Sequence, residues 1–203
     1  MARRKPKQLM DKAEGKASLL EIHCVLKDIV GIQHFLIQGT ALGAYRDHGF
    51  TPTEVDIDIG FLWEDFHTKA HDIASALTVL GYVVEVFNRP FTKPRTVKAV
   101  KGTVKVDLVS WIPWKDKRFT ANLDPAITYS LVHDKELMEN YEEVIVFGTR
   151  FLVPCPIEEY LRREYDDWKT PRFDHRSRTR VAHFRDKEGI PNDFLDTLEE
   201  SHV

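Results

Sequence analysis

The segment 55–61, Val-Asp-Ile-Asp-Ile-Gly-Phe, constrains the fold more than any other part of the chain. Its strict alternation is typical of a β-strand, in which successive side chains point to opposite faces of a sheet. Asp56 and Asp58 therefore share one face, while Ile57 and Ile59 share the other. The pattern predicts a strand that packs its apolar face on a core and carries two neighbouring carboxylates on the opposite face.

Two carboxylates this close repel each other unless a cation lies between them. Asp107 interrupts a Val-rich, strand-like run in the same way, and a neighbouring strand would bring it against Asp56 and Asp58. Three converging carboxylates form a hard-oxygen site that suits Mg²⁺ or Mn²⁺. The alternative is that Asp56 and Asp58 are solvent-facing residues of a one-sided sheet. Because phosphate-binding features lie just upstream, we favour the metal site.

As far as residue 111, the patterns predict helices and strands in the order αβαβαβββ, and a further strand and helix follow. Expected helices are 19–30, ended by Gly31; 41–47; a segment from the cap Asp65 to near Gly81; and 158–167. Expected strands are 34–38, 55–61, 82–87, 96–100, 103–111 and 144–153, with interruptions at 101–102 and 148–149. Fold class is therefore predicted to be α+β, a mixed β-sheet with helices packed against it plus a C-terminal helical element.

Composition supports a single folded domain. The chain has 203 residues, of which 42% are hydrophobic and 30% charged, which is enough to bury a core without disulfides. A net charge of -3 argues against nucleic acid as the main partner, and no apolar run reaches the roughly 18 residues of a membrane span. We expect a cytoplasmic protein with a basic flexible tail (1–16), one domain (17–171) and a polar extension (172–203).

A phosphate site is predicted next to the carboxylates. Gly39 and Thr40 follow an apolar strand and precede a short helix from Ala41, and backbone N–H groups at a helix start can hold phosphates. Gly39 would let the backbone approach a diphosphate, or would simply end the strand in a turn. Arg46 would contact donor phosphates or pair with a neighbouring carboxylate.

The segment 89–105 contains six basic residues and no acid. Such a field would attract an anionic substrate, although lysines also keep an exposed sheet edge soluble. Lys105 is the best single candidate for phosphate binding, because it shares the side-chain face of Asp107.

Two stretches resemble a known family. Residues 39–61 (GTALGAYRDHGFTPTEVDIDIGF) are similar to the signature of the LicD and fukutin proteins of the nucleotidyltransferase superfold, and 154–171 (PCPIEEYLRREYDDWKTP) to that family's C-terminal element. The resemblance brackets residues 38–171. It implies a nucleotidyltransferase-like sheet and an enzyme.

The resemblance implies transfer of a phospho-alcohol, of the phosphocholine or ribitol-phosphate type, from a CDP-linked donor to a sugar or glycolipid hydroxyl. Asp56 and Asp58 would hold two Mg²⁺ or Mn²⁺ ions. Asp107 would hold the ion on the acceptor side and help to take the hydroxyl proton. Tyr165 and Trp168 would stack on a base or cage a quaternary ammonium, or would be core residues.

Two other functions remain open from the sequence. A nucleotidyltransferase would move NMP from an NTP to a small molecule, a protein or RNA, with release of pyrophosphate rather than CMP. A non-catalytic nucleotide-binding module would keep the fold alone, but such a module has no need of three mutually repelling carboxylates.

Overall fold

The computed structural model describes residues 9–88, 93–120, 131–165 and 167–171. The N-terminal residues 1–8, Arg89 and the expected polar extension lie outside the described residues.

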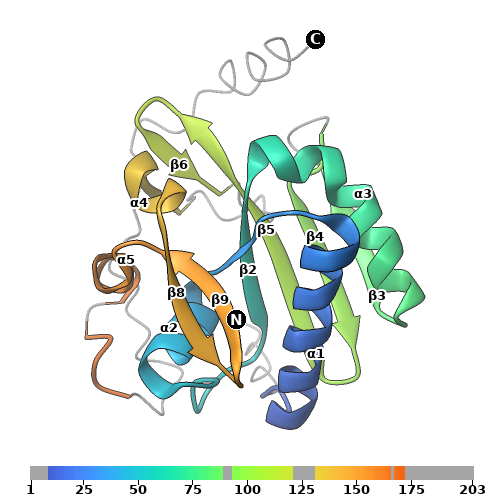
Figure 1. Cartoon of the computed structure of the whole chain (residues 1–203), viewed down its shortest axis with the longest axis horizontal. Coiled ribbons are helices and arrows are strands. Elements are labelled where there is room, and N and C mark those ends of the chain that lie inside the picture. The colour runs from blue at the N-terminus through green and yellow to red at the C-terminus, as the bar shows by residue number, and fades with distance from the viewer. Residues whose placement is uncertain (1–8, 89–92, 121–130, 166, 172–203) are drawn as a thin grey trace, which may run out of the picture.

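The centre of the molecule is a mixed sheet with the strand order β1-β2-β5-β4-β3 (Figure 1). Its strands are β1 (Phe35–Leu36), β2 (Ile57–Leu62), β5 (Val104–Trp114), β4 (Thr96–Lys101) and β3 (Val83–Phe87). β2 and β5 run parallel, and the other neighbours along this path are antiparallel. Beyond Trp111, β5 also pairs with β6 (Lys117–Phe119), which pairs with β7 (Val132–Asp134). The predicted mixed sheet is confirmed.

A separate hairpin is formed by β8 (Tyr141–Val146) and β9 (Thr149–Pro154). Gly148 lies at its turn with a φ of 79°, a left-handed conformation that favours glycine. The predicted interruption at 148–149 is therefore a hairpin turn.

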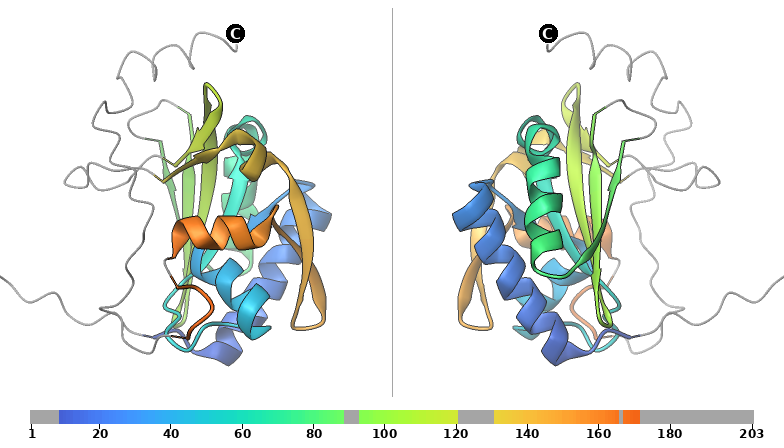
Figure 2. Two further views of the ribbon diagram at one scale, coloured as in Figure 1. Left: turned by 90° about the vertical axis from the view of Figure 1, so that its left-hand side faces the viewer. Right: turned by 90° about the vertical axis from the view of Figure 1, so that its right-hand side faces the viewer.

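Two long helices cover one face of the sheet (Figure 2). Helix α1 (Lys12–Cys24) continues through η1 (Val25–Val30) and ends at Gly31, which has a φ of 65°. Residues 12–16, which the sequence placed in the tail, are therefore helical. Helix α3 (Trp63–Val79) begins two residues before Asp65, which lies in its first turn instead of capping it.

Three shorter helices complete the fold. Helix α2 (Gln38–Leu42) continues into η2 (Gly43–Asp47), so Gly39 and Thr40 lie within its first turn rather than before it. Helix α4 (Lys135–Glu139) follows β7, and α5 (Ile157–Glu164) ends three residues earlier than the sequence suggests. α5 packs against α2 and β9 (Figure 2).

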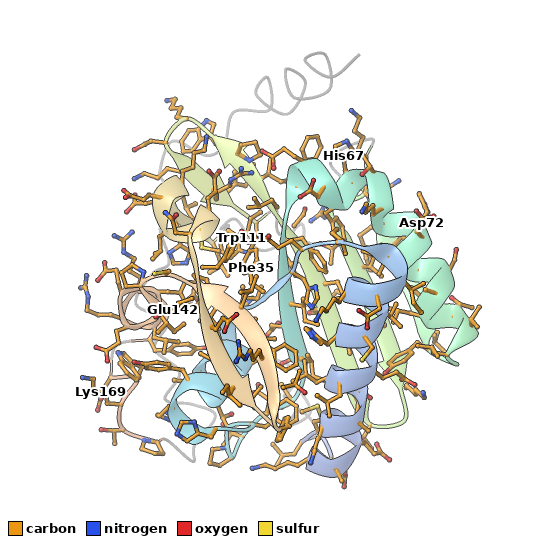
Figure 3. The ribbon with its side chains drawn as sticks, viewed as in Figure 1. Phe35, His67, Asp72, Trp111, Glu142 and Lys169 are labelled. Atoms are coloured by element: carbon orange, nitrogen blue, oxygen red, sulfur yellow. The ribbon has the colours of Figure 1, made fainter. Side chains whose placement is uncertain are left out.

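One apolar cluster joins the sheet, the helices and the hairpin. Ile57 and Ile59 of β2 and Val106 and Leu108 of β5 are fully buried on the helix-covered side. Phe35 and Trp111 lie in the interior, whereas Lys169 lies at the periphery (Figure 3). Among the described residues, no helix combines the length and apolarity needed to span a membrane. Because Ile57 and Ile59 point to the buried side, Asp58 between them points to the opposite face.

Candidate active site

Asp58 and Asp107 are direct neighbours on the two central strands. In the parallel ladder between β2 and β5, Asp58 is paired with Asp107, and paired residues project from the same face of a sheet. Asp58 is 8% exposed, and the Asp107 side chain is 28% exposed. The neighbouring strand therefore brings Asp107 beside Asp58.

Asp56 lies at the end of the same ladder. It occupies a bend one residue before β2 and is half-buried. Asp56 and Lys105 each precede the first residue pair of the ladder, Ile57 and Val106, by one position. Lys105 is exposed and lies two residues from Asp107, on the same face of β5. The predicted carboxylates and the best predicted lysine thus lie at one end of one strand pair.

The chemistry of these side chains fits a divalent cation. Carboxylate oxygens are the ligands that Mg²⁺ prefers, and protein sites for it often provide only one or two, with substrate phosphates and waters completing the shell. Within the described residues, no three acidic, histidine or cysteine side chains are already gathered around one point. Asp56, Asp58 and Asp107 are the residues that would hold a cation, and the substrate would supply further ligands.

Lys98 is a neighbour of Asp107 that the sequence did not single out. In the antiparallel ladder between β4 and β5, Lys98 is paired with Asp107. Its Nζ lies 3.4 Å from Asp107 Oδ2, and the two side chains are 38% and 28% exposed. The Asp107 carboxylate thus has a protein cation beside it. Only the register of the hairpin reveals this contact, because the sequence shows Lys98 as one of six similar basic residues.

The remaining basic residues of this segment are divided between environments. Lys101 pairs with Glu21 of α1, at 3.0 Å, on the helix-covered face. Arg95 is 4% exposed, and burial lowers its pKa to about 10. Lys98 on β4 and Lys105 on β5 lie on the face of Asp107. Lys93 Nζ lies 5.8 Å from the centre of the Trp63 ring, and Arg89 lies outside the described residues.

The start of α2 is fastened to β2 at the acidic site. The Asp58 backbone N–H donates to Thr40 Oγ1 at 2.9 Å, and the Ile37 N–H donates to the Asp58 carbonyl at 3.3 Å. Thr40 is 1% exposed. The Thr40 hydroxyl is therefore bound to β2. This hydrogen bond holds the predicted phosphate site at Gly39 and Thr40 beside Asp58.

Gly39 lies against a buried carboxylate. A Cβ at position 39 would lie 2.7 Å from Glu54 Oε1 and 3.0 Å from Oε2, which is closer than such atoms pack. Glu54 is 2% exposed and accepts a hydrogen bond from the Thr51 hydroxyl at 3.0 Å. The absence of a side chain at Gly39 leaves room for Glu54, and the approach of its backbone to a diphosphate stays a prediction. Nothing in the polar stretch around Glu54 signals its burial.

Tyr160 of α5 contacts the backbone at the start of α2, next to the predicted phosphate site at Gly39 and Thr40. Its hydroxyl accepts a hydrogen bond from the Gln38 N–H at 2.9 Å, and its side chain is fully buried. Gln38 has a φ of 49°, an uncommon conformation for a residue with a side chain. Burial raises the pKa of Tyr160 well above its usual value, and the nearby charges of Glu164 and Asp58 act in the same direction. Helix α5 is therefore linked to the start of α2 by the hydrogen bond between the Tyr160 hydroxyl and the Gln38 N–H.

Arg46 pairs with a carboxylate, which is one of the two roles that the sequence left open. Its Nε and one terminal nitrogen donate to Asp47 at 2.8 and 2.7 Å, and the other terminal nitrogen donates to the Trp168 carbonyl at 2.8 Å. The Trp168 ring lies 5.7 Å from that of Tyr45. Tyr165 is 8% exposed within the core. Tyr165 is therefore a core residue, whereas Trp168 is half-buried beside Tyr45. Binding of substrate by either ring stays a prediction.

Fold and site together define a protein of the nucleotidyltransferase fold, with an acidic centre between two parallel strands. The chain matches the family model described as LicD/FKTN/FKRP, nucleotidyltransferase domain, over residues 31–156. The chain belongs to this family and is a transferase that moves a nucleotide or a phospho-group. The matched segment contains α2 and all three aspartates.

Two solved structures show a similar arrangement. The solution structure of the antibiotic-resistance factor ANT(2'')-Ia has a TM-score of 0.50 at 14% identity, over 93% of this chain and 91% of that chain. The lincomycin-bound crystal structure of the lincosamide antibiotic adenylyltransferase LnuA has a TM-score of 0.48 at 15% identity, over 76% and 86%. At such low identity, the likeness to ANT(2'')-Ia shows the fold alone. A search of curated proteins found no match.

Proposed function

We propose that this chain transfers a phospho-alcohol from a CDP-linked donor to a sugar or glycolipid hydroxyl, in a reaction that depends on Mg²⁺ or Mn²⁺. The observation that carries the proposal is the pairing of Asp58 with Asp107 inside the segment that matches the family. Two acidic residues on adjacent parallel strands, open to solvent on the side of Asp107, suit a phosphorylated substrate whose charge is balanced by a cation.

The reaction forms one bond and breaks another at a phosphorus atom. The acceptor hydroxyl oxygen attacks the phosphorus that carries the alcohol, and the bond from that phosphorus to the CMP oxygen breaks. Asp107 receives the hydroxyl proton, and the CMP phosphate leaves with the electron pair of the broken bond. A bound divalent cation supplies positive charge to the phosphate oxygens.

The residues around the aspartates orient the donor. Asp56 and Asp58 hold the cation, and the rigid attachment of Thr40 to Asp58 keeps the start of α2 in a constant position beside it. The exposed ammonium of Lys105 lies two residues from Asp107 and attracts the anionic diphosphate.

Thermal melts of the full chain test the donor. A native-state ligand at about 100 times its Kd adds about 2.7 kcal/mol, which raises the Tm of a protein of this size by roughly 5–11 °C. We expect such a shift with one CDP-alcohol only when Mg²⁺ is present, together with CMP release when an acceptor is added. A shift with NTPs alone, together with pyrophosphate release, would instead establish nucleotidyl transfer.

Asp58→Asn tests the acidic centre. We expect loss of turnover by about 100-fold or more and loss of the Mg²⁺-dependent Tm shift, because a cation loses one of its carboxylates. The metal-free variant should melt no lower than the wild type, since one of two repelling charges is gone. Asp72→Asn, an exposed position on the outer side of α3 (Figure 3), is the matched control and should behave as wild type. Full activity of Asp58→Asn would refute the proposal.

A further inference from the structure

A row of charged residues crosses the open face of the sheet. Residue pairing runs from Asp58 on β2 to Asp107 on β5, from Asp107 to Lys98 on β4, and from Lys98 to Glu85 on β3. All four residues share the face opposite the fully buried Ile57 and Leu108 side of the sheet, because paired residues of neighbouring strands point the same way. Lys98 is therefore flanked by a carboxylate on each side.

The ion pair between Lys98 and Asp107 is long and solvent-exposed, so another cation can replace Lys98 beside Asp107. Its N–O distance is 3.4 Å, and both side chains are about a third exposed, at 38% and 28%. Ion pairs with this exposure are weak, because water competes for both charges. Glu85, on the far side of Lys98, is exposed and offers the ammonium a second position.

We infer that Lys98 is the resident counter-cation of Asp107, and that a divalent cation and the Lys98 ammonium compete for this carboxylate. Without metal, Lys98 offsets the repulsion between Asp58 and Asp107. When a divalent cation binds, Lys98 moves toward Glu85 and leaves the Asp107 oxygens to the metal and to the acceptor proton. This inference rests on the proposed function and predicts that Lys98 lowers the affinity of its acidic centre for a divalent cation.

The test is titration of the full chain with Mn²⁺ alone, by calorimetry at constant ionic strength. Lys98→Met should bind Mn²⁺ about fivefold more tightly than the wild type, because a competing charge within a few ångströms has been removed. The same variant should melt at a lower temperature in chelator and gain more from added Mn²⁺. Lys98→Gln should reproduce both changes if the methionine variant folds poorly.

Lys101→Met is the matched control. This substitution removes the same charge from the same strand. Lys101 pairs with Glu21 on the helix-covered face, and the two side chains are 41% and 34% exposed, similar to those of the Lys98–Asp107 pair. We expect its Mn²⁺ affinity to equal that of the wild type. A general effect of net charge would instead tighten binding in both variants and would overturn the inference.

Glu85→Gln tests the second position of Lys98. Removing this carboxylate should hold Lys98 on Asp107 and weaken Mn²⁺ binding about twofold, and it should have no effect once Lys98 is methionine. If Mn²⁺ binding depends on Asp107 but is unchanged in Lys98→Met, the inference is wrong and the proposed metal site stands. If the wild type and Asp58→Asn both fail to bind Mn²⁺, the metal-dependent function and the inference fall together.

Discussion

His34 is a buried histidine whose protonation opposes folding. It is 7% exposed, its Nδ1 lies 3.0 Å from the Ile32 carbonyl oxygen, and its Nε2 lies 2.9 Å from Nδ1 of His23. Burial is the main cause that lowers the pKa of His34 to about 4, and burial also lowers the pKa of His23. The neutral rings fit this arrangement, in which His34 donates to the carbonyl and accepts from His23.

The sign of the pH effect follows from these shifts. Because the folded state binds protons less readily than the unfolded chain, the stability contributed by neutral His34 is complete above pH 6.5 and is lost as the pH falls toward 4. We expect a loss of about 3 kcal/mol over this range from His34, measured by urea unfolding at several pH values. His34→Gln should flatten the pH slope; an unchanged slope in this variant would contradict the assignment.

The residues of the site were predictable to different degrees. Asp58 and Asp107 stand out because carboxylates interrupt apolar strands, and that signal survives without any knowledge of strand order. The roles of Lys98 and Tyr160 depend on pairing across the hairpin and across the whole chain, which residue types alone do not encode. Gly39 stands out in the sequence as part of a predicted phosphate site, whereas its contact with Glu54, a buried glutamate in a polar loop, has no signal in the sequence.

At the scale of elements, η2 and the segment after α5 are joined by Arg46. The guanidinium is held by Asp47 and reaches the Trp168 carbonyl, and its side chain is 12% exposed. Tyr45 adds a ring contact with Trp168 and a hydrogen bond to Glu158 at 3.2 Å. The contacts of Arg46 and Tyr45 therefore hold the segment around Trp168 against η2.

Arg46→Gln should release that segment. We expect amide hydrogen exchange in residues 167–170 to accelerate about tenfold, because a charge-assisted bond to the Trp168 carbonyl is lost, while global stability falls by roughly 1–2 kcal/mol. Arg150→Gln removes a guanidinium from an exposed pair on the hairpin and is the control. Equal exchange in the two variants would show that Arg46 does not hold the segment.

Most elements were predictable, and their ends were less so. The hairpin of β4 and β5 and the helix that ends at Gly31 follow from β-branched runs and from glycine in a left-handed conformation. The start of α3 was misplaced because Asp65 is a good cap by residue type, whereas the helix begins at Trp63 to bury its indole. Tertiary packing decided that boundary over local preference.

At the scale of the whole molecule, the small hairpin shares the core of the main sheet. Phe151 of β9 is 2% exposed, and its ring lies 4.5 Å from that of His23 on α1. Val146 and Val153 of the hairpin belong to the same apolar cluster as Ile59 of β2. The hairpin is therefore expected to unfold together with the sheet rather than separately.

Phe151→Ala should lower the free energy of unfolding by about 3–5 kcal/mol, because it leaves a cavity in this common core. Circular dichroism and tryptophan fluorescence should report one coincident urea transition at a lower midpoint. Ile145→Ala, a 62% exposed position on the same hairpin, should change stability by less than about 0.5 kcal/mol. Two separate transitions for Phe151→Ala would show that the hairpin is an independent unit.

The hydrogen bond between Gln38 and Tyr160 joins residues 122 positions apart. A growing polypeptide can pair β2 with β5 once residue 114 has left the ribosome, but the backbone at Gln38 stays without its phenol until α5 has also emerged. Contacts of such long sequence separation form late, since the intervening loop must be closed first. During synthesis, β2 and β5 can therefore pair before Tyr160 can bind the Gln38 backbone at the start of α2. The predicted site is complete only when α5 has been made.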